Sequence, residues 1–445
     1  MNVQIKAAMQ EAINRASDLG ADQSDVVVSS GESFSVSIQD ADIDKYKVSG
    51  SRVLGIRTIK DSRVGLAYTE DLGTDSIELA TKKALQNAEA SEPRPHESIT
   101  IDGGETSIES KYSKDPSTTE EKIDFAKKLE SDVRKKEARV TNIPYNGFSE
   151  STSESYYMNS LNTFNFESEY YLSCYTSALI QEGSNNSMHY ASSIGRSLKE
   201  LDPNYCVSES VEHALNWLEA KSIPTKTYDV VFDLDAFSSL FGCFGGIFSG
   251  KGAMDKVNPF AEKLGERILS EEITLWDKPR VEGAFFESHF DSEGLKQEDL
   301  CLVGEGKLLS FYHNTSTANY FKTTSNARAA RGAKSALGVS GTTKYFDAGK
   351  TETSDLLSGE YLEILSMQGL HSGANSFSGE FSFAASGYLC RDGKRVTPIK
   401  GLTVSGNFYH MMKELKIVGD KVVGTKHRDF FAPLMRFQAV SVGGE

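Results

Sequence analysis

Hydrophobic and polar positions near the N-terminus change from helical to strand-like spacing. Residues 1–20 have the amphipathic spacing of a helix, in which Lys6, Glu11 and Arg15 occupy polar positions. Strand-like runs follow at residues 25–29, 33–38, 43–48, 52–59 and 63–69. The polar residues 60–62 between the last two runs predict an antiparallel hairpin.

Glycine and capping patterns refine this region. Gly55 and Gly65 lie inside predicted strands, where glycine often marks a bulge or a close backbone approach. The sequence Asp75-Ser-Ile-Glu78 resembles a capping box and predicts the start of a helix. The region therefore combines helices with antiparallel strands.

A Pro- and Gly-containing stretch separates this region from the next. We expect a linker at residues 93–116, which include three prolines and a Gly-Gly pair. A capping box at Ser117–Glu120 then predicts a helix, and two or three long strands are expected between residues 139 and 179. Their turns are expected at Asn146-Gly147 and near Asn159. A helix over residues 208–220 ends the second region.

A third region begins with a strand at residues 228–233 and a helix starting near Asp235, a plausible N-cap. The apolar residues of this helix share one face and are predicted to be buried: Phe237, Leu240, Phe241, Phe244, Ile247 and Phe248. Strand-like runs and glycines dominate from there to the end of the chain. This layout predicts a β-dominated C-terminal half.

These patterns predict an α+β protein: N-terminal α+β subdomains with antiparallel or mixed sheets, followed by a β-rich C-terminal domain that is barrel-like or one large sheet. We expect four parts: an N-terminal α+β subdomain at 1–92, a linker at 93–116, a second α+β subdomain at 117–222 and the β-rich domain at 225–445.

Composition narrows the function classes. The net charge of -15 argues against a protein that grips a nucleic-acid backbone, because such binding needs clustered Lys and Arg. Five scattered cysteines without a C-x-x-C pair indicate free thiols and a reducing compartment. No apolar run reaches membrane-spanning length. We therefore expect a cytoplasmic protein without nucleic-acid or membrane partners.

Two loose sets of residues could bind a metal. His289 and Asp291, beside Glu287, form one set, and His371 with the distant Cys390 forms the other. Neither set has compact ligand spacing, so the alternative interpretation is favoured: a turn residue at His371 and a small buried hydrophobe at Cys390.

Other catalytic patterns are weak. His-Glu-x-x-His, G-x-S-x-G and phosphate-loop motifs do not occur in the sequence. A serine nucleophile could pair with His313 or His371, but no spacing selects one. Arg328 and Arg331 could pair with a carboxylate, although solvated charges are the favoured interpretation.

Four segments in the same order carry a family resemblance that extends over nearly the whole chain. They are residues 55–72, Phe290-Asp-Ser-Glu-Gly with the following Gly304-Glu-Gly-Lys-Leu-Leu, residues 378–388, and residues 399–407. With them the chain resembles the TldD/PmbA peptidase family, specifically its PmbA (TldE) branch, whose older label is modulator of DNA gyrase.

The resemblance implies where catalysis would occur and what is absent. TldD-type members resemble zinc peptidases with His-Glu-x-x-x-His on the helix after the third region's first strand. Those positions correspond here to Phe241, Gly242 and Gly246, which cannot bind a metal or move a proton. Metal-bearing members also supply a cysteine near the C-terminus, and none follows Cys390 here.

The resemblance therefore implies a subunit without catalytic or metal-binding residues. It would complete the peptide chamber of a TldD-like metallopeptidase as a heterodimer, or pair with itself, and zinc is expected only in the TldD-like partner. For such a subunit the resemblance also implies a role in the maturation of modified peptides, such as microcins, and in the degradation of unfolded peptides.

A peptide-binding edge is expected near residues 371–383, because an extended peptide can add to a sheet through backbone hydrogen bonds. The candidate substrate-binding residues are His371, Asn375, Ser376 and Gly379. Ordinary core sheet is an equal alternative for this segment.

Two other functions stay open. One is a stand-alone peptidase with a rearranged site that uses His289, Asp291, His371 or Cys390. The other is a non-enzymatic regulator that binds gyrase.

Overall fold

A computed structural model describes residues 2–100 and 103–444, so residues 101–102 of the expected linker lie outside the described residues. The chain forms two compact units. Unit 1 consists of Met1–Ala214, His289–Gln297 and His313–Ser340, and unit 2 consists of Leu215–Ser288, Glu298–Tyr312 and Gly341–Glu445. Both units combine helices with sheets, which confirms the predicted α+β class.

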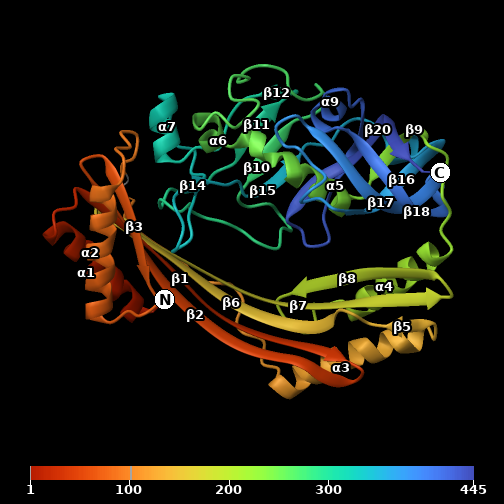
Figure 1. Cartoon of the computed structure of the whole chain (residues 1–445), viewed down its shortest axis with the longest axis horizontal. Helices are drawn as coiled ribbons and strands as arrows, with labels where there is room; N and C mark the ends of the chain where they lie inside the picture. The colour runs from red at the N-terminus through yellow and green to blue at the C-terminus, as the bar shows by residue number, and fades with distance from the viewer. Residues whose placement is uncertain (1, 101–102, 445) are drawn as a thin grey trace. The chain divides into compact units, whose positions relative to one another are not determined.

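An eight-stranded sheet forms the centre of unit 1 (Figure 1). Its strands are β1 (Gln23–Gln39), β2 (Asp42–Lys60), β3 (Arg63–Thr69), β4 (Glu105–Ile108), β5 (Val140–Asn142), β6 (Asn146–Asn159), β7 (Phe164–Glu182) and β8 (Asn185–Gly195). The order is β3-β2-β1-β6-β7-β4, and β5 and β8 also pair with β7. All pairs are antiparallel except β4 with β7.

Strands β1 and β2 are longer than the sequence pattern predicted. The expected runs at 25–29 and 33–38 form one strand, because the polar residues between them pair on both sides. Gly31, for example, lies opposite Ser51 of β2 and Ser153 of β6. The predicted hairpin is confirmed by the pairing of Lys60 with Arg63. Asn146-Gly147 begins β6 and is not a turn, whereas β6 does end at Asn159.

Helices cover parts of this sheet. The helices of unit 1 are α1 (Val3–Asp18), α2 (Thr74–Ala90), α3 (Thr119–Lys136), α4 (Pro203–Leu218, which ends in unit 2) and α7 (Thr315–Phe321). A shared core joins α1 and α2 to the sheet through residues such as Met9, Ile77, Val28 and Ile56. A Cβ atom on Gly65 would lie 1.8 Å from the carbonyl oxygen of Ala84, so the predicted close approach is a helix packed against β3.

Several predicted helix and linker boundaries differ in detail. Helix α2 starts after Gly73, and the capping box before α3 uses Thr118 and Glu121. Asp75 does not cap α2 because it already lies in the first turn. The expected linker contains β4, which pairs with β7.

A buried network of charges holds later segments in unit 1. Arg57 on β2 donates from Nε to Asp25 of β1 at 2.8 Å, and Arg331 lies 2.9 Å from the other oxygen of Asp25. Glu97 and Glu293 lie 3.1 and 3.7 Å from the Arg57 guanidinium. The favoured interpretation of Arg331 as a solvated charge was therefore wrong: its side chain is 1% exposed. The later segment His313–Ser340 also forms the short strands β13 (Ala329–Ala330) and β14 (Gly338–Val339).

A ten-stranded sheet forms the centre of unit 2, which confirms the β-rich C-terminal half. Its strands are β9 (Lys226–Phe232), β10 (Leu275–Lys278), β11 (Leu300–Gly304), β12 (Lys307–Leu308), β15 (Thr343–Phe346), β16 (Glu360–Gln368), β17 (Glu380–Arg391), β18 (Lys394–Asn407), β19 (Ile417–Gly424) and β20 (Phe430–Gly443). Its helices are α5 (Leu234–Phe244), α6 (Gly250–Met254), α8 (Thr353–Leu356), α9 (Phe408–Lys413) and the 3-10 turn η1 (Gly245–Phe248). Among the described residues, none of the helices is both long and apolar enough to cross a membrane.

Candidate functional site

Helix α5 follows β9 directly and buries an aromatic face. Its N-cap is Asp233, whose side chain accepts from the backbone N–H of Asp235 at 3.1 Å, so the prediction of Asp235 as the cap was two residues late. The six apolar residues predicted for this face are all buried. Rings of α5 pack against rings from β15, α9 and β20, so this face serves the core of unit 2.

The three positions that the family resemblance associates with a metal motif hold no metal ligand. Phe241 is 4% exposed, and its ring centre lies 5.5 Å from that of Phe346 and 5.7 Å from that of Phe430. Gly242 and Gly246 lie on an exposed face, where an added Cβ would meet nothing within 4 Å. A zinc ion needs nitrogen, sulfur or oxygen donors, and these residues offer none from a side chain. The residues present therefore do not fit a zinc site.

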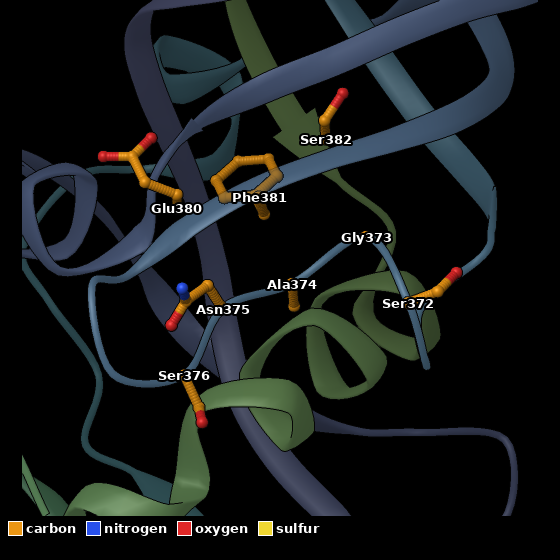
Figure 2. Close-up of a pocket in the computed structure, with 8 residues that line it drawn as sticks. All are labelled: Ser372, Gly373, Ala374, Asn375, Ser376, Glu380, Phe381 and Ser382. Carbon is orange, nitrogen blue, oxygen red and sulfur yellow. The ribbon is translucent and has the colours of Figure 1, made fainter.

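A pocket of about 750 Å³ lies in unit 2 beside the C-terminal end of α5. Figure 2 shows its lining along a turn and the beginning of β17: Ser372, Gly373, Ala374, Asn375, Ser376, Glu380, Phe381 and Ser382. The Cys243 thiol of α5 lies 3.7 Å from the carbonyl oxygen of Leu370, and the Phe244 ring centre lies 6.4 Å from that of Phe381. The C-terminal end of α5 and the segment that lines this pocket are therefore close to each other.

Asn375 shapes the turn. Its side-chain oxygen accepts from the backbone N–H groups of Phe377 and Ser378 at 3.0 and 3.1 Å. Gly379 has a φ of 84°, and a Cβ atom there would lie 2.5 Å from the Tyr409 ring, so the position requires glycine. The hydroxyl of Tyr409 also donates to the carbonyl oxygen of Ser376. These contacts give the pocket wall a defined backbone shape.

The backbone of residues 373–375 covers the edge of β17. The N–H of Asn375 donates to the carbonyl oxygen of Glu380, and the N–H of Ser382 donates to that of Gly373, both at 2.8 Å. Ala374 and Phe381 form a bridge between these bonds. Because backbone groups alternate in direction along an extended chain, the N–H and C=O of Ala374 face away from β17. Within the expected edge at residues 371–383, the outer backbone is therefore that of the turn, which covers the beginning of β17.

The four predicted substrate-binding residues lie in or near this turn. Asn375 and Ser376 line the pocket, while Gly379 is buried under Tyr409 and His371 is exposed one residue before the lining begins. The core-sheet alternative describes one face of β17, since Phe381 and Phe383 are buried there. Glu380 and Ser382, which alternate with these two phenylalanines, are exposed, as the alternation of side chains along a strand explains.

The two loose metal sets do not assemble as proposed from sequence. Cys390 is buried and lies opposite Tyr361 at the start of β16, whereas His371 follows the end of that strand. Seven residues of strand separate the two ends, or roughly 23 Å. Cys390 is thus the small buried side chain of the favoured interpretation, and burial raises the pKa of its thiol to about 11.

His289 and Asp291 make separate contacts in unit 1. The Nδ1 atom of His289 lies 2.8 Å from a carboxylate oxygen of Glu167. Asp291 accepts three backbone N–H bonds, from Glu293, Leu295 and Ala329, which makes it a structural residue of its loop. Burial raises the pKa of Asp291 to about 6.

His313, the other histidine considered as a base, is buried, and its Nδ1 atom lies 3.1 Å from the Thr317 hydroxyl. Burial lowers its pKa to about 4. Glu380 and Ser382 also line the pocket; the sequence analysis placed them within the expected edge but did not single them out as binding residues. The signal that could have found them is their alternation with Phe381 and Phe383 directly after the predicted turn.

Comparison with known families finds three consecutive matches along the chain. Residues 24–88 match PmbA/TldA metallopeptidase domain 1, residues 112–218 match the PmbA/TldA metallopeptidase central domain, and residues 225–444 match the PmbA/TldA metallopeptidase C-terminal domain. Together the matches span most of the chain in order.

Individual relatives agree with these matches. A protein named metalloprotease PmbA from Escherichia coli O157:H7 is 23% identical over 93% of this chain and 92% of its own length. A solved structure from Thermotoga maritima, described as a modulator of a DNA gyrase, has a TM-score of 0.87 at 22% identity and covers 99% of this chain and all of its own. The structure of TldE from Thermococcus kodakarensis has a TM-score of 0.82 at 21% identity, with 98% and 100% coverage. Both solved structures therefore have the same fold as this chain.

Proposed function

Because this chain belongs to the PmbA/TldD metallopeptidase family, we propose that it is the non-catalytic subunit of a cytoplasmic peptidase. It pairs with a TldD-like subunit that supplies the zinc ion, and together the two enclose a peptide. Self-pairing as a homodimer is the arrangement when that partner is absent. The names of the PmbA and TldE relatives support this type of subunit.

The observation that carries the proposal is the composition of α5 and of η1, the 3-10 turn that follows it. A buried phenylalanine and two exposed glycines stand where the zinc-binding and water-activating residues of a metal-bearing member are expected. Restoring a ligand at Phe241 would place a polar group inside an aromatic core, which is costly without a partner. The exposed Gly242 of α5 and Gly246 of η1 add no side-chain bulk to this surface, which suits a wall against which a peptide backbone can lie.

Peptide binding is proposed at the turn over residues 372–376. The outward N–H and C=O of Ala374 can add a substrate strand through backbone hydrogen bonds, which bind many sequences with little preference. Glu380, whose carboxylate accepts from the Asn407 side chain at 2.9 Å, gives the pocket a negative charge. Substrates with a basic residue near the paired segment are therefore favoured.

Reconstitution tests the division of labour. Unstructured peptides are incubated with this chain alone, with a TldD-like protein alone and with both, each with zinc. We expect chelator-sensitive cleavage that requires the TldD-like protein and rises when this chain is added. Chelator-sensitive cleavage by this chain alone, at a rate that the mixture does not exceed, would show a stand-alone peptidase.

The substitution Ala374→Pro tests the binding turn, because proline removes the outward N–H group. Loss of one backbone hydrogen bond raises the KM of the mixture about 2- to 12-fold without lowering the chelator-sensitive rate at saturation. The matched control Ala374→Val keeps the N–H and leaves KM unchanged. An equal KM in both variants would show that the N–H group of residue 374 does not bind the peptide and would contradict the proposed binding turn.

The names of solved relatives as gyrase modulators support one other candidate, a regulator that binds gyrase. Pull-down of gyrase by this chain without a TldD-like protein, together with no effect on peptide cleavage in the mixture, would favour it.

A further inference from the structure

Three metal-binding side chains converge in unit 1, on elements that the proposed function does not use. Glu209 and His213 stand four residues apart on α4 and therefore share one helix face. His189 comes from β8, on the same strand face as the buried Ser187 and Ala191. Their ligand atoms all lie within 4.8 Å of one another. The α4 helix packs on this side of the sheet, since Cys206 of α4 lies 4.0 Å from Cys174 of β7.

The geometry of the three groups approaches that of a zinc site. The Nε2 atom of His213 lies 3.3 Å from a carboxylate oxygen of Glu209. Two ligands of a tetrahedral zinc ion, each bound at roughly 2.0–2.1 Å, stand roughly 3.4 Å apart. The ring centres of His189 and His213 are 4.9 Å apart, with their planes at 67°. The His189 side chain is only partly buried, and its ligand atom lies within 4.8 Å of those of Glu209 and His213.

Burial and donor chemistry point to the same ion. His213 is 4% exposed, whereas the Glu209 side chain keeps 22% of its surface accessible, so an ion can arrive from the Glu209 and His189 side. Two imidazoles and one carboxylate are a ligand set that zinc accepts, with a fourth position for water. Calcium and magnesium prefer oxygen ligands and fit this set poorly.

We propose that His189, Glu209 and His213 bind one Zn²⁺ ion that fastens α4 to β8. When the ion binds, the Nε2 atom of His213 and the carboxylate of Glu209 both become its ligands, and the neutral imidazole carries its one ring proton on Nδ1. The ion would hold the last helix of the N-terminal part of unit 1, directly before the chain continues into unit 2 at Leu215. This site is independent of the α5 positions and holds whether or not the chain is a peptidase subunit.

Zinc titration of the metal-free full chain tests the proposal. Calorimetry with zinc chloride is expected to show one equivalent, and His189→Ala and His213→Ala are each expected to weaken binding about 100-fold or more, beyond the 10- to 100-fold effect of losing an outer partner of a metal ligand. Glu209→Gln keeps a weaker oxygen donor and loses less. His371→Ala is the matched control and binds zinc as the unchanged chain does. No zinc binding, or one equivalent retained at unchanged affinity in His189→Ala, would overturn the proposal.

A second measurement guards against misfolding of the His213 variant. Cobalt added to the metal-free chain is expected to give the visible absorption of a four-coordinate ion, and His189→Ala, at a partly exposed position, is expected to abolish it while the circular dichroism spectrum stays unchanged. Four-coordinate cobalt absorption that persists in His189→Ala but disappears in His371→Ala would place the ion elsewhere and contradict the proposal.

Discussion

The two units are organised around opposite kinds of buried centre. In unit 1, two arginines and three carboxylates meet beneath the long strands, and Arg57 and Arg331 are each 1% exposed at the side chain. In unit 2, rings from α5, β15, α9 and β20 pack against one another, with the Phe244 and Phe408 rings stacked 4.5 Å apart. One centre depends on charge pairing and the other on apolar area.

This difference teaches what each centre contributes. Aromatic packing adds stability through buried area and tolerates neighbours from several elements. A buried ion pair adds little net stability, but removing one partner leaves an uncompensated charge and is strongly unfavourable. The network therefore specifies which segments belong to unit 1, because Glu293 and Arg331 arrive from a part of the chain otherwise occupied by unit 2.

The largest expected effect is in the charged centre. Arg57→Ala leaves Glu97 and Glu293 without their shared guanidinium and is expected to destabilise unit 1 by about 3–5 kcal/mol. Hydrogen exchange in β1 and β2 measures this, because it resolves unit 1 from unit 2. The control Lys60→Ala breaks an exposed pair with Glu89 and costs at most about 1 kcal/mol. Equal effects of the two substitutions would contradict the network's role.

Phe241→Ala is expected to cost about 3–5 kcal/mol in unit 2, nearer the lower value because the surrounding rings can partly close the cavity. Both tryptophans, Trp217 and Trp276, belong to unit 2, so tryptophan fluorescence during denaturant unfolding reports this loss directly. Arg57→Ala should leave that fluorescence transition in place. A common shift in both variants would mean that the two centres unfold together.

The charged centre should also respond to pH. Burial raises the pKa of Glu293 to about 7 from its ordinary 4.5. The unfolded chain releases this proton at lower pH than the folded chain does. The stability that Glu293 contributes is therefore fully present below about pH 4.5 and is lost as the pH rises to about 7. The loss is at most about 3 kcal/mol.

The measurement is the difference between the unchanged chain and Glu293→Gln in the stability of unit 1 from pH 4.5 to 7.5. Gln keeps an oxygen that can accept from the N–H of Thr315. His313 has a lowered pKa, which makes unit 1 lose stability as pH falls. Because both proteins contain His313, this opposing effect cancels in the difference between them. A difference that does not vary with pH would mean that Glu293 stays ionised throughout.

The smallest expected effect separates the two faces of α5. Gly242→Ala adds a methyl group that meets nothing within 4 Å. Because alanine also reduces the backbone freedom of the unfolded chain, the substitution is expected to stabilise unit 2 by about 0.5–1 kcal/mol. Fluorescence-monitored unfolding measures this change, and the free energy of unfolding is expected to rise in Gly242→Ala and to fall in Phe241→Ala, although the two residues are adjacent. Destabilisation by the alanine would show that the glycine face is covered.

Local patterns in the sequence identified many of the elements but few of the contacts. The hairpin at residues 60–63 and the buried face of α5 follow from turn chemistry and helical spacing, which depend only on neighbours in sequence. The missing ligands at Phe241, Gly242 and Gly246 are likewise a property of the residues themselves. The length of β1 could not be predicted, because the polar residues around Gly31 become a strand only when β2 and β6 pair on either side.

The sequence by itself therefore determined the α+β class, the aromatic side of α5 and the absence of metal donors at the family's motif positions. Tertiary structure decided that Arg331 meets Asp25, that residues 373–375 cover the edge of β17, and that His189 joins Glu209 and His213. The physical reason is distance along the chain. Side chains separated by tens or hundreds of residues influence one another only after the sheet pairs and brings them into contact, and no local spacing rule describes that step.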